Sequence, residues 1–367
     1  MRVLGFVAGL AIVAMTATNV FTTLVIPRTT SSLLLRSISK ILAKGLRHLL
    51  RHLRSYGAKD RVMALVGPLA MMLLFVSWLV LLVLGFGLAI WWGSHAALDS
   101  ALVVSGSSVF TLGVAGGRGS TETLDFIAGG TGLLVIALEI AYLPTLYSAF
   151  SSRETEVTLL ATRAGTPAWG PEILTRHQQF GIVSELSELY VTWERWAAAV
   201  SESHTSYPSL MWFRSPDPSR SWLLALLAML DAAALHDSLC PASAPRQARI
   251  CLFMGTNCLR SLAQALHIPF DPDPLPTAVL RLREDEFLAG VDRMAQVDFP
   301  FERTPDEAWR HFTGWRINYE SIADALTRLI VPPPAPWLLS RPELGDPEWP
   351  RVVNRTPDDP EPGSVAA

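Results

Sequence analysis

Three long apolar segments lie within the first 150 residues, and a region with the mixed polar and apolar composition of a globular domain follows them. The segments run from Val3 to Ile26, from Val62 to Trp92 and from Leu124 to Tyr147. A helix needs about 20 apolar residues to cross the hydrocarbon core of a bilayer. Each segment therefore predicts a transmembrane helix, and the third is expected to be interrupted by glycines near its start and by Pro144 near its end.

The first segment also permits a second interpretation. Arg2 precedes its apolar core, and residues 14–17 are small enough for a signal-peptidase site. The segment is long for a signal peptide, however, and only one basic residue precedes the core. A retained helix over residues 1–27 is the prediction, with cleavage as the alternative.

The loop between the first two segments is strongly basic and predicts the orientation of the chain. Loops rich in Lys and Arg stay on the cytoplasmic side, which places the N-terminus and residues 96–123 outside and everything after Phe150 in the cytoplasm. The sequence thus predicts a multi-pass protein of the inner (plasma) membrane. Nine basic residues stand against the single acid Asp60: Arg28, Arg36, Lys40, Lys44, Arg47, Arg51, Arg54, Lys59 and Arg61.

Leucine and isoleucine recur at helical spacing within this basic segment, from Leu35 to Leu53. Such a helix can lie in the headgroup plane, with its basic face toward anionic lipid. Anionic lipid is therefore an expected partner, and a solvated linker helix is the alternative.

Composition supports the assignment to the membrane. Half of the residues are hydrophobic and 17% are charged, and the mean hydropathy of +0.30 exceeds that of ordinary soluble domains. The net charge of −3 averages two dissimilar halves of the chain, so it says little about partners. No nucleic-acid partner is expected.

The segment 96–123 is too short to span and is broken by Ser and Gly, yet its first half is apolar. A re-entrant helix followed by extended backbone fits this pattern, because non-helical backbone at membrane depth is tolerated where it is buried in protein or lines a water-filled path. The segment ends in the string T-L-G-V-A-G-G, residues 111–117.

This string resembles the selectivity filter of potassium channels in its first three residues, Thr111, Leu112 and Gly113. The resemblance covers about residues 62–155, which are two spans and the loop between them. Arg153 and Glu154 close the last span. The resemblance implies that backbone carbonyls replace the hydration shell of a permeant potassium or other monovalent ion, with no other cofactor. It also implies a homotetramer, because one loop cannot enclose a path alone.

Three filter positions depart from the family pattern. Val114 replaces the aromatic residue, Ala115 the second glycine and Gly116 the acid. A Cβ at Ala115 disfavours left-handed backbone by about 1–2 kcal/mol per subunit. The departures predict lower potassium selectivity, and they leave a non-conducting sensor or interaction protein, with the pore fold as scaffold, as the alternative.

Glu139 lies within the third apolar segment, where an ionisable residue is expected to face a cavity or a partner. In a pore it would contribute to a carboxylate ring in the inner vestibule, and the alternative is a neutral side chain bonded to a neighbouring helix. Gly129, Gly130 and Gly132 could form a gating hinge or allow close helix packing.

Residues 151–330 predict an all-helical cytoplasmic domain of about five to seven helices, with helices over 179–202, 222–239, 249–266 and 305–330. The predicted fold is an all-α membrane protein with three transmembrane helices, a re-entrant pore loop and this domain. Its parts are helix 1–27, basic segment 28–61, pore module 62–150, helical domain 151–330 and a Pro-rich disordered tail 331–367, which Trp337 and Trp349 could pin in part.

No nucleophile, phosphate-loop or metalloprotease motif occurs in the domain, so no catalytic residue is assigned and an enzyme is not expected. Cys240, Cys251 and Cys258 lack C-x-x-C spacing, and no metal site is predicted. A ligand pocket around Glu202, His204 and Arg214 is an open possibility beside a structural role for these residues. The domain is expected to assemble the oligomer and to couple a signal to the pore.

Overall fold

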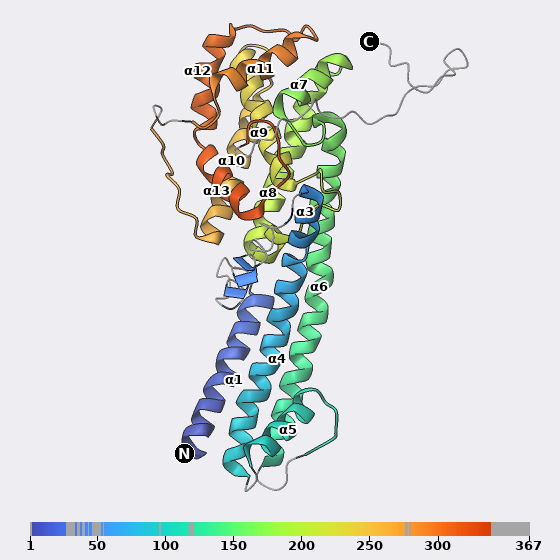
Figure 1. Ribbon diagram of the computed structural model, residues 1–367, viewed down its shortest axis with the longest axis vertical. Coiled ribbons are helices and arrows are strands. Elements are labelled where there is room, and N and C mark those ends of the chain that lie inside the picture. Colours follow the sequence, from blue (N-terminus) through green and yellow to red (C-terminus); the bar gives the residue numbers. More distant parts are fainter. Residues whose placement is uncertain are drawn as a thin grey trace, which may run out of the picture.

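The computed structural model describes residues 2–26, scattered positions between 34 and 53, and residues 55–94, 97–116, 121–275, 278 and 280–338. All regular secondary structure in these residues is helical. An elongated bundle of long helices forms one end of the molecule, and a globular helical domain forms the other (Figure 1). The Pro-rich segment after residue 338, with Trp349, and most of the basic segment 28–61 lie outside the described residues.

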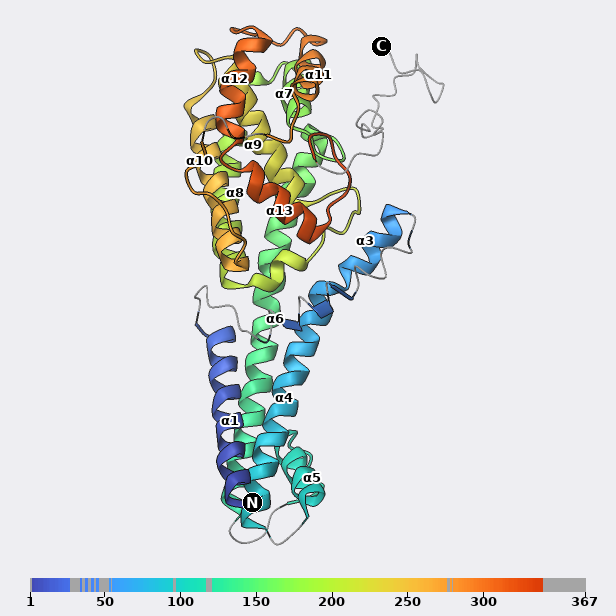
Figure 2. The same cartoon turned by 60° about the vertical axis from the view of Figure 1, so that its left-hand side comes forward.

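The bundle consists of α1 (Arg2–Leu24), α4 (Val66–Gly93) and α6 (Glu122–Ala164), which lie side by side in both views (Figures 1 and 2). Gly9 and Gly85 allow α1 and α4 to approach closely, because a Cβ on Gly9 would lie 2.5 Å from the carbonyl oxygen of Gly85. The outward faces carry exposed apolar side chains, as expected of helices in lipid. The buried core of the bundle comprises Val20, Leu74, Trp78, Leu82, Phe86, Val109, Ala128 and Val135.

Among the described residues, four helical stretches are long and apolar enough to cross a membrane: α1, the stretch Tyr56–Gly93, α6 and Trp222–Leu239. The first three form the bundle. The fourth is α9, whose 18 residues are all buried by the surrounding helices of the globular domain. A helix that is apolar all round is found either in a membrane or in a protein core, and in this structure α9 is the core helix of the domain.

The second and third apolar segments differ from their predicted limits. A short helix α3 (Tyr56–Ala64), capped by Ser55, precedes α4. The expected interruptions of the third segment are wrong, because α6 continues without a break through its glycines and Pro144 and extends to Ala164. Proline is tolerated in such helices where neighbouring groups satisfy the freed backbone.

The globular domain contains α7 (Gly170–Gln179), α8 (Leu186–Ser206), α9 (Trp222–Leu239), α10 (Arg246–Leu266), α11 (Glu284–Ala295), α12 (Pro305–Arg316) and α13 (Glu320–Ile330), with 3₁₀ turns at Val183–Glu185 and Pro208–Trp212. The helices α7, α8, α10 and α12 pack around α9.

Three predicted helices of the domain have different limits in the structure. The helix expected over 249–266 starts three residues earlier, at Arg246. The helix expected over 179–202 starts at Leu186, after a turn at Gly181, whose φ is +68°. The region 305–330 is two helices with a break at residues 317–319. The start of the predicted tail is packed rather than free, since Trp337 is buried and its indole nitrogen donates to the carbonyl of Glu286 at 3.0 Å.

Candidate functional site

A short helix, α5 (Leu98–Val109), lies against α4 and α6 at the end of the bundle far from the globular domain (Figure 1). The Ser105 hydroxyl donates to the carbonyl of Val83 at 2.8 Å, which fixes α5 to α4. Gly132 of α6 admits α5, because a Cβ at this position would overlap the carbonyl oxygen of Val109. Ser105, on the side of α5 that faces α4, and Gly132, on α6, therefore set the position of α5 in the bundle.

The loop after α5 contains the filter-like residues. Thr111 and Gly113 have φ values of +53° and +67°, so left-handed residues alternate with others along the chain. Ser107 holds the loop at two points: its carbonyl accepts from the Leu112 amide at 2.8 Å, and its hydroxyl accepts from the Ala115 amide at 3.0 Å. The loop is thus anchored to the last turn of α5.

The filter-like residues lie mainly on the surface of the single chain. Thr111, Leu112, Gly113 and Gly116 are exposed, and the Val114 side chain is 80% exposed. Ala115 is half-buried. The loop therefore has a free face that a second copy of the chain could meet.

Glu139 has a different environment. Its side chain is buried within its own chain, with 9% of its surface exposed, and its Oε1 atom has no hydrogen-bond partner among the described residues. Val135, one turn earlier, belongs to the buried bundle core. A vestibule acid shared by several copies would be exposed in one copy, so this placement favours the alternative of a contact with neighbouring helices.

The three glycines of α6 have unequal surroundings. Gly132 is packed against α5, a Cβ on Gly129 would make an ordinary contact with Ser108, and a Cβ on Gly130 would meet nothing within 4 Å. Gly132 therefore has a packing role. A hinge at these glycines stays a prediction.

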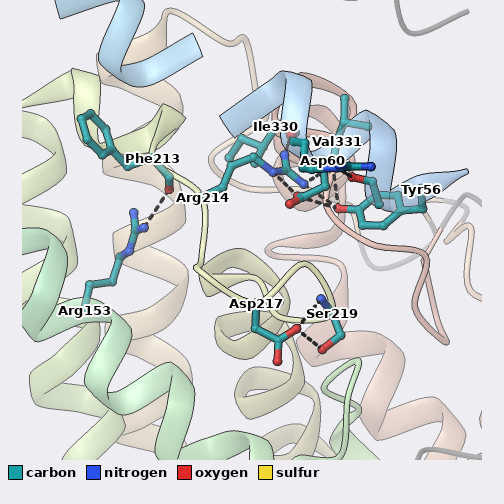
Figure 3. Close-up of polar contacts among 11 residues, drawn as sticks. Tyr56, Asp60, Arg153, Phe213, Arg214, Asp217, Ser219, Ile330 and Val331 are labelled. Carbon is teal, nitrogen blue, oxygen red and sulfur yellow. Dashed lines mark hydrogen bonds and ion pairs between the residues drawn. The ribbon is translucent and has the colours of Figure 1, made fainter. Parts of the chain in front are cut away.

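The end of the bundle nearest the globular domain is tied to that domain by a strap, residues 210–214. Arg153 of α6 donates to the carbonyls of Leu210 at 3.0 Å and Phe213 at 2.8 Å (Figure 3). Its guanidinium also binds Glu154 at 2.7 Å and lies 3.0 Å from Nε2 of His204. Arg153 is almost fully buried, so these contacts satisfy a charge that burial alone would make costly.

Arg214, at the other end of the strap, binds α3 and the end of α13 together (Figure 3). Its Nε atom lies 2.5 Å from the Asp60 carboxylate, and Nη2 lies 2.5 Å from the Tyr56 hydroxyl. Nη1 donates to the Ile330 carbonyl at 2.6 Å, and Nη2 donates to the Val331 carbonyl at 2.9 Å. We call this group of contacts the Arg214 clamp.

The strap also packs against the start of α4, where a Cβ on Gly67 would lie 2.8 Å from the Phe213 ring. One five-residue strap therefore contacts two bundle helices, α4 and α6, on the side of the globular domain. One signal of the clamp is present in the sequence, because Asp60 is the only acid in the basic segment. Its partner, 154 residues away, has no signal in the local pattern.

The structure gives Glu202, His204 and Arg214 separate partners. His204 contacts Arg153, and burial, followed by the nearby Arg153 charge, places the pKa of His204 well below its usual value. Arg214 belongs to the clamp, while Glu202 is exposed beside an open crevice between the middle of α6 and the end of α8. The possible pocket of these three residues is therefore not formed.

The three cysteines are free and buried, and burial raises the pKa of Cys251 and Cys258 to about 12. Within the part of the chain that the structure describes, no group of three His, Cys, Asp or Glu side chains is placed to hold a metal ion. Comparison of the chain with protein-family models, curated proteins and solved structures finds no match.

Proposed function

We propose that the chain is a potassium-channel-like membrane protein that conducts monovalent cations passively through a homotetrameric pore of low selectivity. The proposed topology has three spans, α1, α4 and α6, with the N-terminus outside and the globular domain in the cytoplasm. In this arrangement α5 is the pore helix, and Thr111 to Gly116 form the filter.

The observation that carries the proposal is the geometry of the α5 loop. A short helix wedged between two long apolar helices is followed by a loop in which left-handed Thr111 and Gly113 alternate with other residues. Alternation of this kind turns successive carbonyl oxygens toward one side, as a filter that replaces the hydration shell of an ion requires. The Ser107 hydroxyl supports the loop from the side of α5.

The strap gives the domain a route to the proposed pore. Arg153 holds it to α6, the helix after the filter, and the Arg214 clamp holds it to α3, which leads directly into α4. A change in the domain that moves the strap would therefore act on both helices that flank the filter loop.

The alternative is a membrane-anchored sensor or interaction protein that does not conduct. Two observations favour it: Val114 exposes an apolar side chain where the filter family has an aromatic brace, and Glu139 faces its own chain. In this interpretation the strap would pass information between the bundle and the domain without a pore.

Ion flux from liposomes that contain the purified full-length protein separates the two functions. Potassium, sodium and a large organic cation are compared for the wild type, Thr111→Ala and Glu139→Gln, and chemical crosslinking determines the oligomeric state. Cation flux from a tetramer that Thr111→Ala abolishes is expected. A monomer, or a tetramer without flux, would contradict conduction and favour the sensor function.

A further inference from the structure

The globular domain contains a cavity of about 170 Å³ between α9, α13, the segment before α11 and the start of the predicted tail. Three of the residues that α9 contributes to its wall are apolar and buried, Leu224, Leu227 and Ala228, and the fourth is Asp231. The opposite wall carries charged and aromatic side chains. The cavity is thus amphipathic, with an apolar side and a polar side.

The floor of the cavity is a closed ion-pair network. Arg316 donates to both carboxylate oxygens of Asp231 at 2.8 Å and to Glu320 at 2.9 Å, and its remaining Nη2 donates to the carbonyl of Trp337 at 2.9 Å. Tyr319 donates to Asp231 at 2.7 Å. These groups satisfy one another, so the floor is a rigid base and not the group that requires a ligand.

Two polar atoms of cavity-lining residues lack a partner. The first is on Asp324. Two arginines bind its Oδ2 atom, Arg281 at 3.2 Å and Arg328 at 2.6 Å. Its buried Oδ1 atom accepts no hydrogen bond from the described residues. The buried indole Nε1 of Trp169 likewise has no acceptor there. A buried polar atom without a partner is destabilising, so a ligand that offers a donor and an acceptor would stabilise the domain.

We propose that this cavity binds a small aliphatic amino acid as its zwitterion. The ammonium group would donate to Asp324 Oδ1. The carboxylate would accept from Trp169 Nε1 and face Arg281 and Arg283, whose side chains are 51% and 62% exposed. The aliphatic side chain would contact the α9 wall, and a cavity of this size fits a ligand of about six to nine non-hydrogen atoms, since about 150 Å³ holds benzene.

The helix α13 connects this cavity to the Arg214 clamp. Its face with Glu320, Ala323, Asp324 and Thr327 lines the cavity. Arg214 donates to the carbonyl of Ile330, the last residue of α13, and to the carbonyl of Val331, which follows it. The cavity-lining face of α13 ends at Thr327, about one turn before the carbonyls that Arg214 binds. Ligand contact along α13 would therefore order the clamp and α3. An effect of this link on ion flow rests on the proposed function, whereas binding and ordering do not.

Isothermal titration of the full-length protein in detergent with L-valine, isovalerate and isobutylamine tests the site, since the last two lack the ammonium and the carboxylate of valine. Valine is expected to bind at least about tenfold more tightly than either analogue. Equal binding of an analogue would overturn recognition of a zwitterion, and no heat with any aliphatic amino acid from alanine to leucine would overturn the site.

Two conservative variants locate the binding. Trp169→Phe removes the indole N–H and Asp324→Asn removes the carboxylate charge, and each is expected to weaken valine binding at least about tenfold. Trp222→Phe and Asp292→Asn make the same chemical changes away from the cavity and are expected to leave the Kd unchanged. Equal loss in the control pair would mean that the effect is not local to the cavity.

Hydrogen exchange tests the link through α13. Saturating valine is expected to slow exchange of the α3 amides, Tyr56–Ala64, in the wild type. In Arg214→Met this slowing should disappear, and the Kd for valine should rise by no more than the factor by which valine slows α3 exchange in the wild type, because coupling between two sites is reciprocal. Valine binding with unchanged α3 exchange in the wild type would overturn the link.

Discussion

Breaking the Arg214 clamp should release α3 from the globular domain. The Arg214 and Asp60 side chains are 8% and 11% exposed, so solvent screens their interaction little. Arg214→Met keeps the apolar stem but leaves the Asp60 carboxylate buried and two carbonyls without their donor. Removal of one partner of a buried ion pair costs about 3–5 kcal/mol, and we expect this loss in the local stability of α3.

The double variant gives the sharper test. Asp60→Asn alone should cost about 1–3 kcal/mol, because a charged hydrogen bond becomes neutral. In Arg214→Met with Asp60→Asn no buried charge is left, and replacing both partners of such a pair is often nearly neutral. The double variant should therefore be more stable than Arg214→Met alone, a coupling that independent sites do not show.

Amide hydrogen exchange of residues 56–64 in the full-length protein measures this quantity, because local opening of one element has its own free energy. Arg61→Met is the control, since Arg61 is an exposed cation of the same helix, and its effect should stay within about 0.5 kcal/mol. Additive losses in the double variant, or no change in α3 exchange in Arg214→Met, would refute the role of the clamp.

Three further predictions concern the bundle and the domain. Gly132→Ala should lower the unfolding temperature, at a cost of about 1–3 kcal/mol, because its Cβ would overlap α5. The control Gly130→Ala has free space around the new Cβ and should be neutral or stabilise by up to about 1 kcal/mol. Equal shifts of the unfolding temperature would contradict this packing. Ser107→Ala should speed amide exchange in the filter-like loop and reduce cation flux, and unchanged exchange would argue against its anchoring role. Burial lowers the pKa of His236 to about 4, so on acidification the imidazole is protonated in the unfolded chain at a higher pH than in the folded one. Stability should therefore fall by up to about 3 kcal/mol as pH drops from about 6.5 to 4. An equally steep fall in His236→Gln would contradict this.

Features set by local composition could be predicted from the sequence. Apolar length identified the bundle helices, and the limits of α9, Trp222–Leu239, were predicted correctly because polar and Pro-containing turns bound the apolar run on both sides. The limits of α8 were missed because apolar spacing continues through residues 180–185, where a turn forms. Helical periodicity does not report such a break when the turn itself carries apolar residues.

The surroundings of Glu139 could not be predicted in the same way. The cost of burying an ionisable group in an apolar helix indicates that it faces protein or water, but not which neighbour it faces. That choice depends on the rotation of α6 against α4 and α1. Since α1 has no counterpart in the two-span family that the loop resembles, the resemblance carries no information about how α1 covers the bundle. The ion pairs of the domain could not be predicted either, because their partners lie far apart in the sequence: Asp231 and Arg316 are separated by 85 residues.

The strap constrains how the domain and the bundle can move relative to each other. Arg153 of α6 binds its backbone carbonyls, while the side chain at its other end, Arg214, binds α3 and the end of α13. A displacement of α13 can thus break contacts with α3 while Arg153 still holds the strap to α6. Two states that differ in the clamp alone would then change the position of α4 relative to α6, and these are the two helices against which α5 and its filter-like loop are packed. On the proposed function, this difference gives a signal received by the domain one route to the loop.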